Sequence, residues 1–201
     1  MKMELVVYAR GGKAVPGSPR EVEEAVDQAL TPSISPNSAP WAIARFALLE
    51  EGRQVADSNL SVSVNPENGY GALVWGVDGN SSRRGGIYDF SWISDNPDPP
   101  GFDPVLVSDP CFPRFHSPRS ALPVEQIREA ILEFCRSPFG ERPECITWVT
   151  GELNGVRHDD EPEEGPVEDD SAWLAAFRSF ADTLRPSTPH GADDNNGSSA
   201  G

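Results

Sequence analysis

The side chains of this chain that could do chemistry are three histidines, three cysteines and several pairs of acidic residues. The histidines fall in segments typical of loops or of a polar tail, and none lies at ligand spacing from a cysteine: they are His116, His158 and His190. Structural zinc needs such spacing, so the pattern does not predict a zinc site. His158, Asp159 and Asp160 could hold a hard cation loosely, but a charged run of this kind is more typical of solvated surface.

The cysteines and the acidic pairs also lack the arrangement that chemistry requires. Cys111, Cys135 and Cys145 cannot all pair with one another, and their spacing matches no disulfide framework. Cys135 falls on the apolar stripe of an expected helix, which indicates a reduced core residue. The pairs at 23–24 and 50–51 lie on an expected exposed face or strand end, and adjacent residues on a strand point to opposite faces. These pairs therefore do not predict acid–base catalysis.

Sequence motifs of the common catalytic sites do not occur in the chain. It contains neither the H-x-E with P-C-x-x-C of zinc deaminases nor a G-x-S-x-G, P-loop or G-x-G-x-x-G motif. We therefore predict no catalytic residue, no bound metal, no cofactor and no enzymatic activity.

Aromatic and acidic side chains gather instead near one loop-rich edge. Aromatic anchors carry much of the binding energy of protein interfaces, so these residues are candidates for contact with a protein partner. The candidates, together with the first acids of a later acidic run, are Tyr88, Asp89, Trp92, Asp95, Asp159 and Asp160. The alternative is that Trp92 only caps the core.

The charge of the chain bounds its partners. Thirty-two acidic residues stand against sixteen basic ones, which gives a formal net charge of −16. Such a chain repels nucleic acid and anionic membranes and attracts a basic partner; alternatively, the acidity serves solubility. The apolar run at residues 5–9 is too short for a signal peptide, and no segment approaches the roughly 20 apolar residues that span a bilayer. We expect a cytoplasmic protein with no membrane or direct nucleic-acid partner.

The elements that must position these side chains alternate between strand and helix patterns. Ser18, Pro19 and Glu21 form a helix start with a capping box, and alternating apolar residues predict a strand with one solvated face around 60–64. Helices are expected at 18–30 and from Pro123 to about 136, and strands at 4–9, 41–49, 60–64, 70–75, 87–93, 105–107 and 145–149. This order predicts an α+β fold, with a mainly antiparallel sheet and two helices packed on one face.

The last fifty residues differ in composition from the rest. Residues 159–170 contain eight acids and no base, which indicates a segment that cannot fold alone. An amphipathic C-terminal helix is expected at 171–184, followed by a disordered tail. We therefore predict an α+β domain over 1–150, an acidic linker with a helix over 151–186, and a tail over 187–201.

The closing helix, turn and strand at residues 122–149 also carry a resemblance. A helix ending in Glu-Phe, a Gly-x-Arg-Pro turn and a strand with Trp resemble the closing half of a bacterial immunity-protein family from polymorphic toxin systems. The matching residues are Glu133, Phe134, Gly140, Arg142, Pro143 and Trp148. An opening strand, a capped helix and a turn-strand at 69–73 are similar in outline, so the resemblance covers roughly residues 1–150.

The resemblance implies a function that composition alone does not. Members of that family usually sit beside toxins with deaminase domains, so the implied partner is a cognate toxin, a nucleic-acid deaminase with a basic substrate channel. The protein would bind this toxin and block its active site, and the zinc and catalytic glutamate would belong to the toxin. Two alternatives stay open: an acidic adaptor or regulatory module without a toxin partner, and an unrecognised enzyme. Trp148, at the end of a β-rich strand, is expected in the core.

Overall fold

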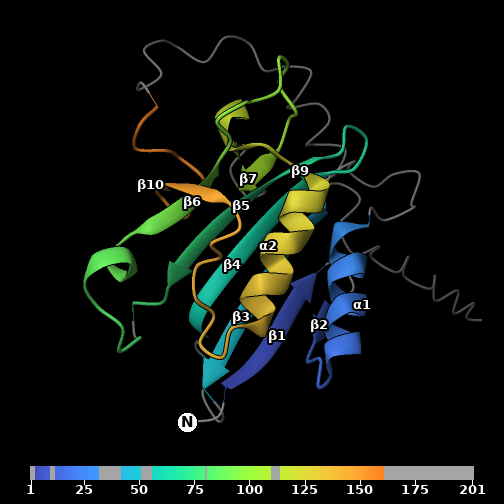
Figure 1. Cartoon of the computed structure of the whole chain (residues 1–201), viewed down its shortest axis with the longest axis vertical. Helices are drawn as coiled ribbons and strands as arrows, with labels where there is room; N and C mark the ends of the chain where they lie inside the picture. The colour runs from blue at the N-terminus through green and yellow to red at the C-terminus, as the bar shows by residue number, and fades with distance from the viewer. Residues whose placement is uncertain are drawn as a thin grey trace, which may run out of the picture. The chain divides into compact units, whose positions relative to one another are not determined.

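Two helices cover one face of an antiparallel sheet (Figure 1). The computed structural model describes residues 3–9, 12–31, 42–50, 56–79, 81–109 and 114–160. Within these ranges the helices are α1 (Pro19–Leu30) and α2 (Val124–Arg136), and the strands are β1 (Met3–Ala9), β2 (Gly12–Ala14), β3 (Ala42–Glu50), β4 (Ala56–Asn65), β5 (Tyr70–Val77), β6 (Ser91–Asp95), β7 (Val107–Asp109), β8 (Arg114–Phe115), β9 (Leu122–Pro123) and β10 (Thr147–Gly151). The predicted α+β class is confirmed.

The main sheet has the strand order β10-β6-β5-β4-β3-β1-β2, and the short β9 pairs with the start of β5. Strands β3, β4 and β5 are the longest and lie at its centre, and all its pairs are antiparallel. β7 and β8 form a separate two-stranded sheet. None of the helices in the described ranges is both long and apolar enough to cross a bilayer.

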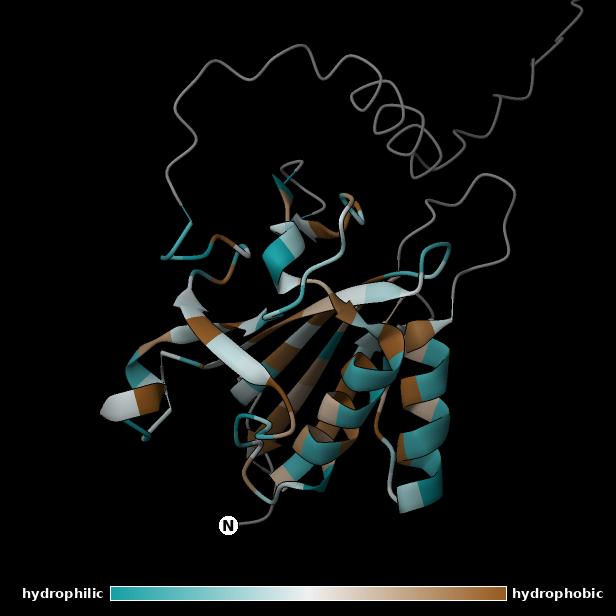
Figure 2. Ribbon diagram, turned by 45° about the horizontal axis from the view of Figure 1, so that its top comes forward, coloured by the Kyte–Doolittle hydropathy of each residue, from teal (hydrophilic) through white to brown (hydrophobic). Residues whose placement is uncertain are grey.

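The core lies between the sheet and the two helices. Alternation along the strands sends one set of side chains toward the helices, and Phe46, Leu60 and Trp75 from β3, β4 and β5 are fully buried there. Ile127 and Ile131 of α2 pack into the same cluster. Figure 2 shows the apolar sides of both helices turned toward the sheet and their hydrophilic sides turned away.

The helix starts follow the sequence closely. The Ser18 hydroxyl accepts a hydrogen bond from the Glu21 amide at 3.3 Å, and the Glu21 carboxylate accepts one from the Gly17 amide at 2.7 Å. This is the predicted capping arrangement. The second helix begins at Val124 rather than at Pro123, because Pro123 is in an extended conformation and pairs with Tyr70 of β5.

Three segments differ from the sequence-based expectation. The first part of the expected strand at 87–93 is instead a 3₁₀ turn, η1 (Gly86–Asp89), and β6 begins at Ser91. Gly85 and Gly86 have φ values of 85° and 62°, which glycine adopts readily, and the Tyr88 amide donates to the Gly85 carbonyl at 3.3 Å to close the turn. The expected edge strand at 105–107 begins two residues later, since Val105 has a φ of 52°. The expected loop at 110–121 contains β8 and a second 3₁₀ turn, η2 (Pro118–Ser120). The expected C-terminal helix at 171–184 and the tail lie outside the described residues.

The other face of the sheet is covered only in part. Leu106 and Ala121 pack on Ala72 of β5, and Leu153, from the turn after β10, lies so close to Gly76 of the same strand that a Cβ there would be 3.6 Å from it. Beside these covering residues, side chains of β1, β3 and β4 line a hollow on the same face of the sheet. Charged, polar and aromatic side chains gather in two regions: this hollow, and the sheet edge at β6 and β10.

Candidate functional site

The loop at 137–146 is held against the sheet by tryptophans. The Trp75 indole N–H donates to the Gly140 carbonyl at 3.0 Å, and the Trp148 indole N–H donates to the Pro143 carbonyl at 2.7 Å. Trp75 is fully buried. Trp148, expected in the core, is half-buried, because its strand β10 forms the edge of the sheet.

The other residues that carry the family resemblance shape the same loop. The Glu133 carboxylate accepts hydrogen bonds from the amides of Glu144 and Cys145 at 2.7 and 3.1 Å. Gly140 has a φ of 59°, and a Cβ there would lie 2.2 Å from the Ser58 hydroxyl. The Arg142 guanidinium lies 4.0 Å from the centre of the Trp92 ring, which is cation–π distance. These motif residues therefore hold the loop in place rather than form a reactive centre.

The candidates Tyr88 and Trp92 lie beside this loop and have internal partners. The Tyr88 hydroxyl donates to the Glu141 carboxylate at 2.9 Å, and this hydrogen bond raises the pKa of the tyrosine. The Trp92 indole donates to the Ile87 carbonyl at 2.8 Å. Asp89 is exposed and accepts a hydrogen bond from the Gly85 amide at 2.9 Å. Of these three candidates, Asp89 is the one with an exposed side chain.

The candidates Asp95, Asp159 and Asp160 converge on one buried arginine. The Arg157 side chain is 1% exposed and forms ion pairs with Asp95 at 2.6 Å, with Asp159 at 2.9 Å and with Asp160 at 3.6 Å. Arg119 of η2 pairs with Asp159 and Asp160 from the outside, at 2.7 and 3.0 Å. The three acids thus fix the segment after β10 to β6 and η2.

Burial and the acids act on the Arg157 charge in opposite directions. Burial lowers the pKa of Arg157, but the hydrogen bonds and charges of Asp159 and Asp95 outweigh this effect and raise it. The hydrogen bond from Arg157 in turn lowers the pKa of Asp159. Arg157 and Asp159 are therefore both charged at neutral pH, and the three carboxylates of the cluster are about one-third exposed, at 31% to 38%.

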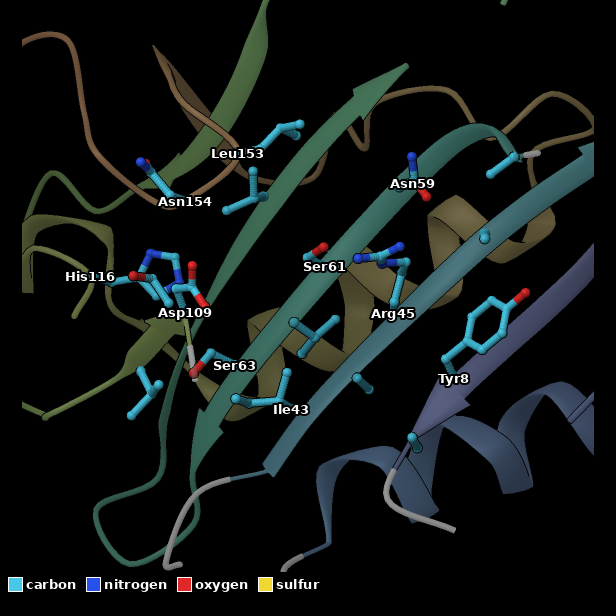
Figure 3. Close-up of a pocket in the computed structure, with 18 of the residues that line it drawn as sticks. Tyr8, Ile43, Arg45, Asn59, Ser61, Ser63, Asp109, His116, Leu153 and Asn154 are labelled. Atoms are coloured by element: carbon cyan, nitrogen blue, oxygen red, sulfur yellow. The ribbon is translucent and has the colours of Figure 1, made fainter. Parts of the chain in front are cut away.

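The hollow on the open face of the sheet has a volume of about 770 Å³. Its floor includes a row of directly paired residues, in which Tyr8 of β1 faces Arg45 of β3, and Arg45 faces Ser61 of β4. Figure 3 shows these three side chains on neighbouring strands, with His116 and Asp109 at another side of the hollow. Neighbouring lining residues are mostly small or polar: Ala47, Asn59, Ser63, Ser108 and Asn154.

Three buried polar atoms at the hollow lack a hydrogen-bond partner within the described ranges. They are the hydroxyls of Ser63 and Ser108 and the Nδ1 atom of His116. Arg45 is exposed and also has no hydrogen bond or ion pair to a described residue. Buried polar atoms are nearly always paired, so the hollow has unused hydrogen-bonding capacity.

Sequence reasoning missed the hollow. The alternation of Ser61 and Ser63 with apolar residues indicates a solvated strand face, which is correct, but it does not show that other segments wall that face. His116 stands in an expected loop, whereas it is 4% exposed in the structure. Arg45 is the sequence feature that could have pointed to this face of the sheet, because it is a charged residue inside the otherwise apolar run of β3.

Burial of His116 predicts a pH dependence of stability. Burial lowers the pKa of His116 from 6.5 to about 4. The unfolded chain then binds a proton between these values while the folded chain does not, so stability falls as the pH drops. We expect a loss of about 2 kcal/mol from this group between about pH 7 and pH 5. Urea unfolding of the wild type and of His116→Gln across that range measures it: the variant's stability should fall less, and parallel curves would contradict a buried neutral His116.

The described residues of these two regions do not form a metal site. No group of three or more His, Cys, Asp or Glu side chains there could bind a metal ion. Cys135 is half-buried and unpaired, and burial raises the pKa of its thiol to about 12, so it stays protonated at neutral pH. Cys111 lies outside the described residues.

Comparison with known proteins gives one match. A family model described as immunity protein Imm1 matches residues 10–150. This span contains both helices, the loop at 137–146, most of the floor of the hollow and most of β10. No curated protein and no solved structure matches the chain.

Proposed function

This chain belongs to the Imm1 family of immunity proteins, and from that premise we propose that it neutralises a cognate toxin by stoichiometric binding, without catalysis of its own. The family match over residues 10–150 is the observation that carries the proposal. The motif loop supports it, because its Gly-x-Arg-Pro residues make structural contacts with Trp75, Trp92 and Trp148.

We propose further that the toxin is a nucleic-acid deaminase and that binding covers its active site. An enzyme acting on single-stranded nucleic acid needs a positively charged groove along its substrate. A chain with a formal net charge of −16 complements such a groove, and charge complementarity speeds association and excludes wrong partners. The protein would therefore occupy the path of the nucleic acid and need not touch the catalytic metal.

The proposed contacts fall into two groups. Tyr88, Asp89 and Trp92 form one group, on η1 and β6. Asp95, Asp159 and Asp160 form the other, in which each carboxylate is still about one-third exposed while it pairs with an arginine. A partner cation can share such a partly hydrated carboxylate.

Removal of the Asp89 charge should slow association with the toxin. Asp89→Asn keeps an oxygen for the Gly85 amide but loses the charge, so we expect the association rate constant to fall about two- to threefold at low salt. The dissociation rate constant should stay unchanged, because an exposed charge acts mainly on the rate at which the two proteins encounter each other. Stopped-flow mixing at low and high salt measures both rates, and a difference that persists at high salt would argue against a steering role.

Protection of living cells tests the proposed function. Bacteria expressing the toxin encoded by the adjacent gene should survive when this chain is co-expressed, and the two proteins should co-purify in equal amounts. An inactive toxin variant controls for the burden of expression. Continued killing, with the chain soluble and abundant in the same cells, would contradict the immunity function and favour the adaptor alternative.

A further inference from the structure

We propose that the hollow on the open face of the sheet receives an acidic side chain of the toxin, and that Arg45 pairs with its carboxylate. This inference rests on the proposed function and assigns a surface and a contact to it. The occupant is a protruding toxin segment that carries Asp or Glu.

The first argument is the isolation of Arg45 in a chain rich in acids. The buried Arg157, the half-buried Arg83 and the exposed Arg119 each pair with acidic side chains. Arg45 lies at the centre of the sheet and is unpaired within the described ranges. An unpaired cation between neutral residues favours an anionic group from outside the chain.

The second argument is the set of groups around Arg45. Ser61 lies directly across from it on β4, and the Tyr8 hydroxyl belongs to its other cross-strand neighbour. The unpaired atoms of Ser63, Ser108 and His116 line the same hollow. Hydroxyls can donate to both oxygens of a carboxylate while the guanidinium binds it. The hollow thus offers several donors around one cation.

The third argument is the shape and the border of the hollow. A volume of about 770 Å³ lies within the range of protein binding pockets and admits a side chain with part of its backbone. Two of its lining residues are large and exposed: Leu153 at 70% and Tyr8 at 40%. Apolar and aromatic residues around polar groups are typical of protein interfaces, which favours a protein segment over a small anion.

The open face of the sheet also continues toward the cluster of Asp95, Asp159 and Asp160 around Arg157. A Cβ at Gly76 would meet both Leu153 and Ser91 at 3.6 Å, so Ser91 of β6 projects onto the open face. Asp95, four residues further along the same strand, projects to the same side by alternation. One toxin surface could therefore place an acid at Arg45 and basic residues near Asp95.

Variants of the hollow test the inference. Arg45→Glu reverses the cation, Arg45→Gln removes it with little change of shape, and Ser61→Trp fills the hollow. The matched control is Arg20→Glu, a charge reversal of an 88% exposed side chain on α1, on the opposite face. The probe is an inactive form of the toxin encoded by the adjacent gene, and affinity is measured by calorimetry after thermal unfolding has shown that each variant is folded.

The expected results differ by variant. Arg45→Gln should weaken binding at least about tenfold, as loss of a charged hydrogen bond does, and Arg45→Glu and Ser61→Trp by about 100-fold or more. Arg20→Glu should stay within about threefold of the wild type, and an acid-to-lysine change in the toxin should restore binding of Arg45→Glu.

If the wild type binds and the folded Arg45 variants bind equally well, the hollow is not the docking site. If inorganic phosphate occupies the hollow without weakening toxin binding, the site is a small-anion site instead. If the wild type itself does not bind, the proposed function fails rather than this inference.

Discussion

Replacement of Arg157 by methionine should lower the free energy of unfolding by about 3 kcal/mol. The side chain is 1% exposed and donates to Asp95 and Asp159, and to the Arg119 carbonyl at 3.2 Å. Methionine keeps much of the volume but leaves the Asp95 carboxylate and the Arg119 carbonyl without this donor, and it leaves Asp159 and Asp160 with Arg119 as their remaining ion-pair partner. The carboxylates are about one-third exposed, so water can partly replace the arginine, and the loss lies at the low end for a broken buried ion pair. Chemical denaturation at neutral pH measures the change.

Arg119→Met is the matched control, because Arg119 pairs with Asp159 and Asp160 but is 48% exposed. Exposed ion pairs contribute about 1 kcal/mol or less, so this variant should be nearly as stable as the wild type. The pKa of Asp159 is lowered from 3.8, so its contribution is present above that pH and is lost as the pH falls through the lower folded pKa. Equal losses for the two arginine variants would show that Arg157 is not buried as described.

Replacement of Trp75 by alanine should cost about 4 kcal/mol, within the range for large aromatic side chains removed from a core. Trp75 is fully buried between the sheet and the motif loop, and its indole holds the Gly140 carbonyl. The variant therefore loses apolar contacts, gains a cavity and frees the loop that the family motif forms. Thermal and urea unfolding should both show the lower free energy of unfolding. Toxin binding should decrease only in proportion to the fraction of the variant that is unfolded.

Two further tryptophan variants separate these effects. Trp75→Phe keeps most of the apolar volume and removes the hydrogen bond, so it should cost less than Trp75→Ala. Trp148→Ala should also cost less, about 1–2 kcal/mol, because Trp148 is half-buried on the edge strand β10. A loss at Trp148 as large as that at Trp75 would place both indoles in the core, as the sequence alone suggests.

The elements of the fold were predictable where local signals were strong. The Ser18 cap set the start of α1, and alternation of polar and apolar residues identified β4. Tertiary contacts decided the segments that local pattern could not. The apolar residues at 87–93 suit a strand, but positive φ at Gly85 and Gly86 makes η1. Trp148 suits a core, but whether its strand lies at the centre or at the edge depends on pairing with β6, which the sequence does not show.

The candidate site was less predictable because it depends on contacts between distant residues. Asp95 was predicted as a partner contact from its place beside aromatic residues, and Asp159 and Asp160 from the acidic run that they begin. The structure shows that all three also pair with Arg157, which is 62 residues from Asp95 along the chain. A lone arginine after a turn gives no sign that it will be buried. The hollow, similarly, is walled by residues of β7, by His116 directly after β8 and by the turn after β10. No local sequence pattern indicates that these segments approach β3 and β4.

The central claim is that this chain neutralises a toxin by stoichiometric binding. The most direct measurement titrates the purified protein into a fixed concentration of the toxin encoded beside it and follows the proposed toxin activity, deamination of single-stranded nucleic acid. We expect activity to fall linearly and to end at a one-to-one ratio, at both low and high salt, with faster association at low salt. Full deaminase activity in the presence of excess folded protein at both salt concentrations would contradict the claim.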